Sequence, residues 1–288
     1  MRQITKELIQ KYNIRLTKSL GQNFLVDDNV IDKIVDAADV NKKDIVIEVG
    51  PGIGNMTRKL AQRAGRLVAI EIDKHLVPPL TEVLGEFPNA SLINKDILKT
   101  SLGQIINEEK SKAPEAEAVK VVANLPYYIT TPIIMKFLEE NPGINAMVFM
   151  IQKEVGDRIV ASPGGKDYGA LSVAVQYYSK PERVFDVPPH SFIPQPDVDS
   201  TVIRLNVFSE PEVKLKNKDI FFQTVKASFG QRRKTLLNAL SNSKKFVESK
   251  EEIRLLLNKL GINENARGET LNINEFAQIA NLFSERNS

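Results

Sequence analysis

A glycine-rich loop is the first stretch of this chain whose residue types and spacing point to ligand binding. It reads IEVGPGIGN (residues 47–55), and Gly50, Gly52 and Gly54 give it a G-x-G-x-G spacing. A dinucleotide fingerprint is G-x-G-x-x-G, and Asn55 stands where its third glycine would be. Glycines let a backbone approach a ligand closely at the start of a helix. The loop therefore predicts a ligand that contains a nucleoside.

Three carboxylates are spaced to select that ligand. Glu48 lies two residues before Gly50, where it would repel the pyrophosphate of a dinucleotide but attract an ammonium or sulfonium group. Glu71 and Asp96 each end an apolar run. The first can accept hydrogen bonds from both ribose hydroxyls and the second from an adenine amino group. Because ligands bind where parallel strands end, the set favours S-adenosylmethionine over NAD as the cofactor.

A second group of residues is suited to chemistry on an amine, and it consists of Asn124, Leu125, Pro126 and Tyr127, within VVANLPYYITTP (residues 121–132). The amide oxygen of Asn124 and a neighbouring carbonyl can accept the hydrogens of an exocyclic amine. This frees the lone pair of its nitrogen for in-line attack on a methyl sulfonium. Pro126 fixes φ, and Tyr127 offers a face for base stacking. A turn needs no adjacent aromatic residue, and here there are two. We interpret the stretch as a site for an extruded aminopurine or aminopyrimidine.

The elements that must position these residues alternate between apolar runs and amphipathic stretches. Helices are predicted at 27–40, 55–65 and 131–141, and strands at 44–50, 66–73, 90–97, 119–126 and 144–152. Continuous apolar strands separated by helices imply a parallel sheet that is buried on both faces. A strand at 201–208 is expected to be the last of this sheet.

Beyond this strand the pattern changes to helices only, predicted around 219–229, 232–242, 249–260 and 272–284. We therefore expect an α/β, Rossmann-like domain over residues 1–208 and a smaller all-α domain over residues 209–288.

Composition excludes several classes of protein. The 288 residues include no cysteine, which excludes disulfides, thiolate zinc sites and cysteine nucleophiles. His75 and His190 have no partner at metal-ligand spacing, so no metal is expected. The sequence has no run of about 18 apolar residues and no signal-like start. We therefore expect a cytoplasmic protein without a membrane span.

The positive charge is concentrated at the two ends of the chain. Residues 209–288 hold 14 Lys and Arg against 10 Asp and Glu, and residues 1–20 hold five basic side chains and one acid. Such asymmetry is typical of proteins that bind a phosphate-rich partner. Its densest cluster is predicted to bind RNA and consists of Lys226, Arg232, Arg233 and Lys234. A solvated amphipathic helix packing on its own domain is the alternative reading.

Several motifs together resemble those of a known family. LGQNFL (20–25), EVGPGIG (48–54) and NLPY (124–127) look like the adenine-N6 dimethylases of ribosomal RNA. FDVPPHSFIPQPDVDSTVIRL (185–205) and SFGQRRKTLLNAL (228–240) narrow the resemblance to the KsgA (RsmA) family of small-subunit enzymes, over nearly the whole chain.

This resemblance implies a class I S-adenosylmethionine-dependent methyltransferase fold and a specific reaction. Methyl groups would pass from S-adenosylmethionine to the N6 amines of two adjacent adenines. These lie in the 3′-terminal hairpin loop of small-subunit (16S) rRNA, which links the enzyme to small-subunit biogenesis. The expected partner is this rRNA or the pre-30S particle, and the enzyme is expected to be a monomer.

The resemblance also assigns roles to individual residues. Asn23 and Leu25 are expected to cover the cofactor, and Phe192 to sandwich the target base against Tyr127. YYITTP departs from the form YNISTP that is found in some members, but this leaves Tyr127 intact. Expected contacts of the cofactor are Gly50, Gly52, Glu71, Asp96 and Asn124.

Three other functions remain open at this point. A large-subunit rRNA dimethylase that confers antibiotic resistance would share the glycine loop and the N-x-P-Y corner. A ribosome-assembly or transcription factor could keep the fold without catalysis, although the acidic set and NLPY are intact. A DNA adenine methylase often has N/D-P-P-Y and needs duplex-reading elements, which we do not find in this sequence.

Overall fold

The computed structural model of the protein describes residues 1–14, 21–231, 233–243, 246 and 248–286. Its backbone divides into two compact units. The first comprises Met1–Gly156 and Lys180–Ser209, and the second comprises Asp157–Ser179 and Glu210–Ser288. The segment 157–179 thus groups with the second unit, whereas the sequence-based division placed it in the first domain. No helix in the described ranges is long and apolar enough to span a membrane.

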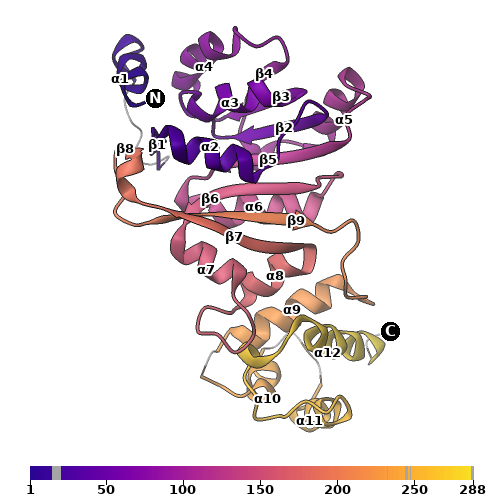
Figure 1. The fold of residues 1–288 in the computed structure, drawn as a ribbon. Helices are drawn as coiled ribbons and strands as arrows, with labels where there is room; N and C mark the ends of the chain where they lie inside the picture. Colours follow the sequence, from indigo (N-terminus) through magenta and orange to yellow (C-terminus); the bar gives the residue numbers. More distant parts are fainter. Residues whose placement is uncertain (15–20, 232, 244–245, 247, 287–288) are drawn as a thin grey trace. The chain divides into compact units, whose positions relative to one another are not determined.

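A seven-stranded sheet forms the centre of the first unit (Figure 1). Its order is β4 (Ala90–Asn94), β3 (Arg66–Glu71), β2 (Asp44–Val49), β5 (Ala118–Asn124), β6 (Ala146–Gln152), β9 (Ser200–Val207) and β7 (Ser179–Val187). The first five strands are parallel, which confirms the predicted α/β class. β9 pairs antiparallel with β6, so the expectation of an entirely parallel sheet is wrong at this end. β7 was not predicted.

Helices cover the sheet because its central strands are apolar on both faces. All six residues of β2 are buried. α2 (Asp28–Ala37) begins where the Asp27 carboxylate accepts hydrogen bonds from two backbone amides, and it buries Ile31, Ile34 and Val35. It packs beside α3 (Asn55–Arg63) in one hydrophobic cluster. In Figure 1, α2 lies in front of the sheet and α6 (Thr130–Glu140) lies behind it.

The register of the parallel strands places their carboxyl ends at one edge. Val49 of β2 is level with Ile70 of β3 and with Ala123 of β5. Glu71 and Asn124, one residue further along, therefore flank the loop that follows β2. α4 (Val77–Leu84) follows β3 along the chain, and α5 (Leu102–Lys112) follows β4.

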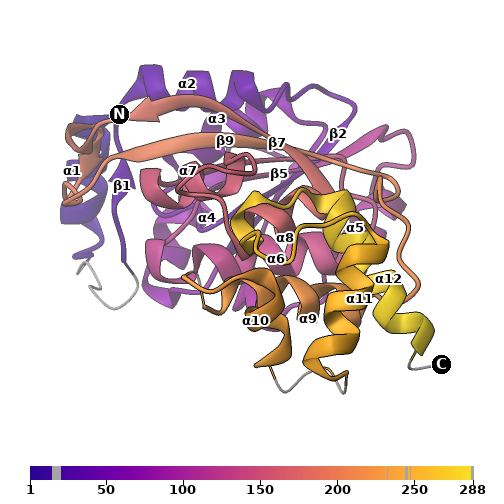
Figure 2. The same cartoon turned by 90° about the horizontal axis from the view of Figure 1, so that it is seen from below.

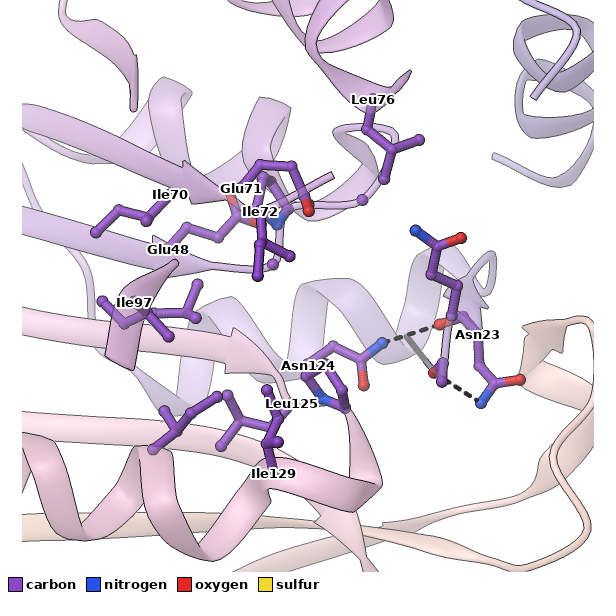
Figure 3. A pocket seen from close by; sticks show the side chains of 18 of the residues that line it. Asn23, Glu48, Ile70, Glu71, Ile72, Leu76, Ile97, Asn124, Leu125 and Ile129 are labelled. Atoms are coloured by element: carbon purple, nitrogen blue, oxygen red, sulfur yellow. Dashed lines mark hydrogen bonds between the residues drawn. The ribbon is translucent and has the colours of Figure 1, made fainter. Parts of the chain in front are cut away.

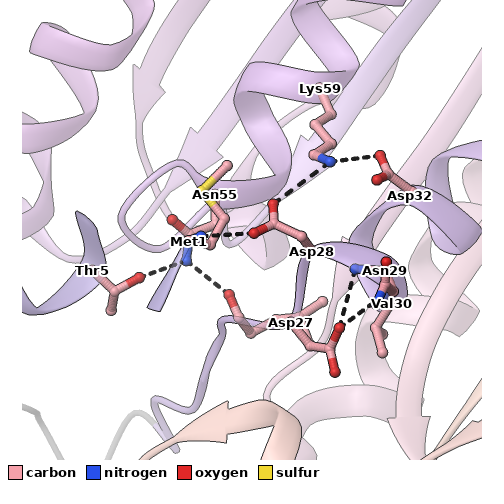
Figure 4. A network of polar contacts seen from close by, with 10 residues as sticks. Met1, Thr5, Asp27, Asp28, Asn29, Val30, Asp32, Asn55 and Lys59 are labelled. Carbon is pink, nitrogen blue, oxygen red and sulfur yellow. Dashed lines mark hydrogen bonds and ion pairs between the residues drawn. The ribbon is translucent and has the colours of Figure 1, made fainter. Parts of the chain in front are cut away.

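An N-terminal helix that the sequence did not predict packs near the same edge. α1 (Arg2–Lys11) buries Thr5 and Leu8, and the Lys11 ammonium pairs with Glu82 of α4 at 2.6 Å. Figure 4 shows two further contacts: the amide of Asn55 donates to Thr5 Oγ1 (3.0 Å), and the Met1 ammonium pairs with an α2 carboxylate (2.7 Å). β1 (Phe24–Leu25) pairs antiparallel with β8 (Phe192–Ile193).

The second unit is helical (Figure 2). Aromatic packing explains why 157–179 belongs to it: Tyr177 of α8 contacts Phe221 and Phe222 of α9, and Tyr168 contacts Phe229. Its helices are α8 (Ala170–Tyr178), α9 (Lys218–Phe229), α10 (Leu236–Ser241), α11 (Lys250–Lys259) and α12 (Ile273–Arg286). The division of the chain after Gly156 falls within α7 (Lys153–Val160).

The helix predicted over 232–242 is shorter than expected. Thr235 is its N-cap and accepts a hydrogen bond from the backbone amide of Asn238, so the helix begins only at Leu236. Arg233 and Lys234 consequently lie in the turn before α10, and both are exposed. Arg232 lies outside the described residues.

Candidate active site

A pocket opens at the carboxyl edge of the sheet, within the first unit. Its walls come from the segment 21–25, the loop after β2, and the ends of β3, β4 and β5. It brings together ten of the residues singled out in the sequence: Asn23, Leu25, Gly50, Gly52, Glu71, Asp96, Asn124, Leu125, Pro126 and Tyr127. Figure 3 shows several of their side chains converging on this space. The roles assigned to them remain predictions.

The glycine loop follows a path that other residues could not take. Gly52 has φ +62°, and a Cβ on it would lie 3.0 Å from the ring of Phe24. Gly54, the N-cap of α3, has φ +88°, and a Cβ there would lie 2.9 Å from Val83. Both glycines are therefore required by backbone conformation and by close packing. The loop brings its backbone close to the pocket and starts α3 beside it.

Glu48 is a buried acid without a counter-charge. Glu48 is 0 % exposed, and neither of its carboxyl oxygens has a hydrogen-bond partner among the described residues. Burial raises the pKa of Glu48 to about 8, with a contribution from the neighbouring carboxylate of Glu71. The Thr57 hydroxyl offsets part of this shift but does not reach hydrogen-bond geometry. An unpartnered carboxyl that lines a pocket fits a ligand with an ammonium or sulfonium group.

This arrangement predicts that Glu48→Gln flattens the pH dependence of stability in the cofactor-free protein. The raised pKa means that folded protein keeps a proton which the unfolded chain releases, so stability is lost as pH rises towards 8. The melting temperature of the variant should exceed that of wild type at pH 9, by roughly 2–4 °C per kcal/mol of relieved desolvation. At pH 5 this advantage should be absent.

Thermal unfolding without cofactor between pH 5 and pH 9 is the measurement. Glu117→Gln, at an exposed glutamate paired with Lys43, is the matched control and should leave the pH profile unchanged. A constant difference between Glu48→Gln and wild type at all pH values would contradict the raised pKa.

Glu71 ends β3 with its carboxyl facing the pocket. The backbone amide of Asp73 donates to its Oε1 at 2.8 Å, and Asn94 braces its carbonyl oxygen at 2.7 Å. Burial nevertheless raises its pKa to about 7. Asp96 is half-buried after β4 and accepts from the backbone amide of Leu98 at 2.9 Å. Both acids keep acceptor oxygens for a polar ligand.

Asn124 is held in one orientation by the segment that passes over the pocket. Its Nδ2 donates to the backbone carbonyl of Asn23 at 3.0 Å (Figure 3). This assignment leaves Oδ1 as the free acceptor. The Leu125 amide donates to the Met150 carbonyl at 3.0 Å, which fixes the next peptide in the same way. The corner therefore presents Oδ1 of Asn124 as an acceptor to an incoming amine.

The segment 21–25 is secured at two further points. Gln22 Nε2 donates to Asp73 Oδ2 at 2.8 Å, and Asn55 Nδ2 donates to the Leu25 carbonyl at 2.7 Å. Asn55 is 7 % exposed and was not predicted to take part. The sequence signal that could have found Asn55 is its place at the third glycine of the dinucleotide fingerprint, because an amide there can tie the covering segment to α3.

The two aromatic residues expected to hold a base are placed differently. Tyr127 is half-buried in the pocket wall, and its hydroxyl shares a 2.6 Å hydrogen bond with Ser200. Phe192 does not line the pocket. It is 1 % exposed and packs in the hydrophobic cluster with Leu25, which is opposite it in the β1–β8 pair. In this arrangement the ring of Phe192 is closed off by the core, and stacking on a base would require the β8 segment to move.

Comparison with known proteins decides what kind of site this is. A model of the family described as ribosomal RNA adenine dimethylase matches residues 13–285. The chain belongs to this family. Curated relatives agree over nearly the full length. The small subunit rRNA methyltransferase A of Alkaliphilus oremlandii is 54 % identical over 98 % of this chain and 96 % of its own length, and that of Clostridioides difficile is 53 % identical over the same shares.

Solved structures support the same fold. A dimethyladenosine transferase from Plasmodium falciparum has a TM-score of 0.78 and 26 % identity, covering 92 % of this chain and 98 % of that one. The 23S rRNA methyltransferase ErmE has a TM-score of 0.67 and 26 % identity, covering 91 % and 100 %. The Rossmann-like methyltransferase fold expected from the sequence is thus confirmed.

The chain is an S-adenosylmethionine-dependent rRNA adenine dimethyltransferase. The chemistry of its pocket fits that cofactor independently of the comparisons. The pocket has a glycine loop at the start of a helix, a buried carboxyl without a counter-charge at Glu48, and further acids at Glu71 and Asp96. Among the residues that the structure describes, no group of three or more His, Cys, Asp and Glu side chains could hold a metal ion.

Proposed function

We propose that this enzyme dimethylates the N6 amines of two adjacent adenines in the 3′-terminal hairpin loop of small-subunit rRNA. The names of its relatives, small subunit methyltransferases at 50–54 % identity, support the choice of subunit. We further propose that it acts as a cytoplasmic monomer on pre-30S particles during small-subunit biogenesis.

The observation that carries this proposal is the fixed amide of Asn124. Its nitrogen donates to the Asn23 carbonyl, which orients Oδ1 so that it and the neighbouring Leu125 carbonyl accept the two hydrogens of the adenine amine. This favours pyramidal geometry at the nitrogen and localises its lone pair. Pro126 keeps the two acceptors rigid, and Tyr127 stacks on the base in an orientation fixed by its hydrogen bond to Ser200.

Each of the proposed cofactor-binding residues contacts a different part of the methyl donor. When bound, S-adenosylmethionine supplies an electrophilic methyl group on a positively charged sulfur. Glu48 compensates positive charge of the donor, Glu71 accepts from its ribose and Asp96 accepts from its adenine. The segment 21–25 excludes water over them. No side chain has to remove a proton before attack, because the amine already has its lone pair. The methyl group exchanges its bond to sulfur for a bond to nitrogen, the neutral thioether product leaves, and the nitrogen then releases its extra proton to solvent.

A direct test offers isolated small and large ribosomal subunits, both from cells that lack the modification, to the purified enzyme with labelled cofactor. We expect label on small subunits only, and mapping should locate it as dimethyladenosine at two neighbouring positions. Label on large subunits would instead favour the alternative function as a resistance methylase, because the structure of a 23S rRNA enzyme shares this fold. Binding without methyl transfer would favour an assembly factor.

We propose that the first unit is the catalytic domain and that the helical unit binds RNA, mainly through Lys226, Arg233, Lys234 and Arg232. The first three are exposed. The neighbouring Leu236, Leu237 and Leu240 are buried in the helical unit. Guanidinium groups suit phosphate because they can donate two parallel hydrogen bonds.

Arg233→Ala combined with Lys234→Ala should weaken binding to the small subunit and flatten its salt dependence. Each lost phosphate contact lowers the salt slope by about one unit. Filter binding at several salt concentrations measures this. Affinity for S-adenosylmethionine should stay unchanged, because the cofactor pocket lies in the first unit.

Lys250→Ala combined with Lys259→Ala removes two other exposed charges of the helical unit and serves as the control. A salt slope equal to that of wild type in the Arg233/Lys234 variant would remove the RNA-binding role of this turn.

A further inference from the structure

Tyr128 is an aromatic side chain for which the reaction proposed above has no use. It follows Tyr127 directly. It is 55 % exposed, which makes it one of the large exposed apolar side chains in the described part of the chain. Nevertheless, it lines the cofactor pocket. A half-exposed ring at the mouth of a pocket can gain burial when a ligand enters.

The two adjacent tyrosines point to different partners. The Tyr127 hydroxyl is engaged by Ser200. Tyr128 packs instead beside Gly21, at the start of the covering segment: a Cβ placed on Gly21 would lie 3.4 Å from Cδ1 of the ring and 3.9 Å from Pro126. The glycine thus leaves the ring room to lie against the backbone of the segment that closes the pocket.

The surroundings of the phenol locate it further. Burial raises the pKa of Tyr128, and the carboxylates of Asp96 and Glu71 contribute to the shift. Both acids line the same pocket and stand at the ends of β4 and β3. Tyr128 therefore shares the pocket with the two acids that the proposed site assigns to the ribose and the adenine.

We propose that Tyr128 is a cofactor-contacting residue, whose ring covers the nucleoside of the methyl donor between the covering segment at Gly21 and the acids Asp96 and Glu71. The ligand class is an adenine nucleoside that carries a sulfur substituent. The inference rests on the proposed cofactor site. Contact with the ring buries apolar surface of both partners and adds to affinity.

Calorimetry with S-adenosylmethionine and with its demethylated product tests this contact. Tyr128→Ala should raise both dissociation constants about tenfold, since an aromatic contact of this size corresponds to roughly that factor. Tyr128→Phe keeps the ring and should stay within about threefold of wild type. Leu98→Ala is the matched control, because Leu98 is an exposed apolar side chain (37 %) after the same edge and is absent from the pocket wall.

A spectroscopic variant makes the test independent of affinity. The chain contains no tryptophan, so Tyr128→Trp places the single indole of the protein at the pocket mouth. Its fluorescence should change in intensity and wavelength as the cofactor is titrated, and the change should saturate with the calorimetric dissociation constant. Val184→Trp, at an exposed position of β7, should show no such change.

The outcomes separate this inference from the site on which it rests. If Glu71→Ala weakens cofactor binding and Tyr128→Ala does not, the site is right and the role of Tyr128 is wrong. If Tyr128→Ala raises only the Michaelis constant for the RNA, the ring stacks on a base of the substrate, and the inference is overturned. If neither variant affects cofactor binding, the proposed pocket itself is wrong.

Discussion

Asn124→Ala is expected to lower methyl transfer by roughly 10²-fold or more, since it removes a preorganised acceptor at the reacting nitrogen. The side chain is held by one hydrogen bond to Asn23, and cofactor affinity should therefore change by no more than about tenfold, the worth of one neutral hydrogen bond. Single-turnover rates with saturating cofactor and RNA measure the chemical step separately from binding.

Two further variants identify what the amide contributes. Asn124→Asp keeps an acceptor oxygen but loses the donor to Asn23, and an intermediate rate is expected. Asn145→Ala changes an asparagine beside the opposite end of the sheet, where Oδ1 accepts from the Val119 amide. This variant should transfer methyl groups at the wild-type rate, once any loss of folded protein is taken into account. Wild-type turnover in Asn124→Ala would remove Asn124 from the mechanism.

Glu71→Ala should weaken S-adenosylmethionine binding by about 1.5–3 kcal/mol, the range for hydrogen bonds to a charged group. This corresponds to roughly 10- to 150-fold in the dissociation constant. Calorimetry is the measurement, and Glu86→Ala, at an exposed glutamate paired with Arg58, is the control. An unchanged dissociation constant would mean that the ribose is held elsewhere.

The same residue predicts how cofactor binding depends on pH. With a pKa of about 7 in the cofactor-free protein, Glu71 becomes protonated as the pH falls from 8 to 6, and the neutral carboxyl accepts fewer hydrogen bonds. The dissociation constant should therefore rise over that interval. In Glu71→Gln the rise should be smaller, and the part that remains belongs to Glu48, whose pKa of about 8 acts in the same direction.

The carboxyl edge of the sheet was the most predictable part of this molecule. Short continuous apolar runs that are rich in β-branched residues and bounded by turn residues favour buried strands. In a parallel sheet, the residue that ends each run then falls at the ligand edge. Glu71, Asp96 and Asn124 could be placed in one pocket for this reason. Such runs do not reveal whether a strand is parallel or antiparallel to its neighbour, because a buried antiparallel strand has the same apolar pattern. The direction of β9 was missed accordingly.

The unpredicted elements carry weak local patterns. β7 is an outer strand that includes Pro181, and its residues are largely exposed, so it reads as a polar loop. α1 buries only Thr5 and Leu8 and is held by long-range polar contacts such as Thr5 with Asn55. The burial of Phe192 depends on the pairing of β8 with β1, two residues each, which no periodicity reveals.

The hydrogen bond from Asn124 to Asn23 joins the covering segment to the reacting corner. A carboxamide that nothing holds can turn about its own bond and present either its oxygen or its NH₂ group to an amine. The Asn23 carbonyl selects one of these orientations, because it accepts from Nδ2 at 3.0 Å. The backbone of the covering segment therefore has two tasks, since it lines the cofactor pocket and also sets the acceptor of the corner. A change that displaces residue 23 is expected to disturb both at once.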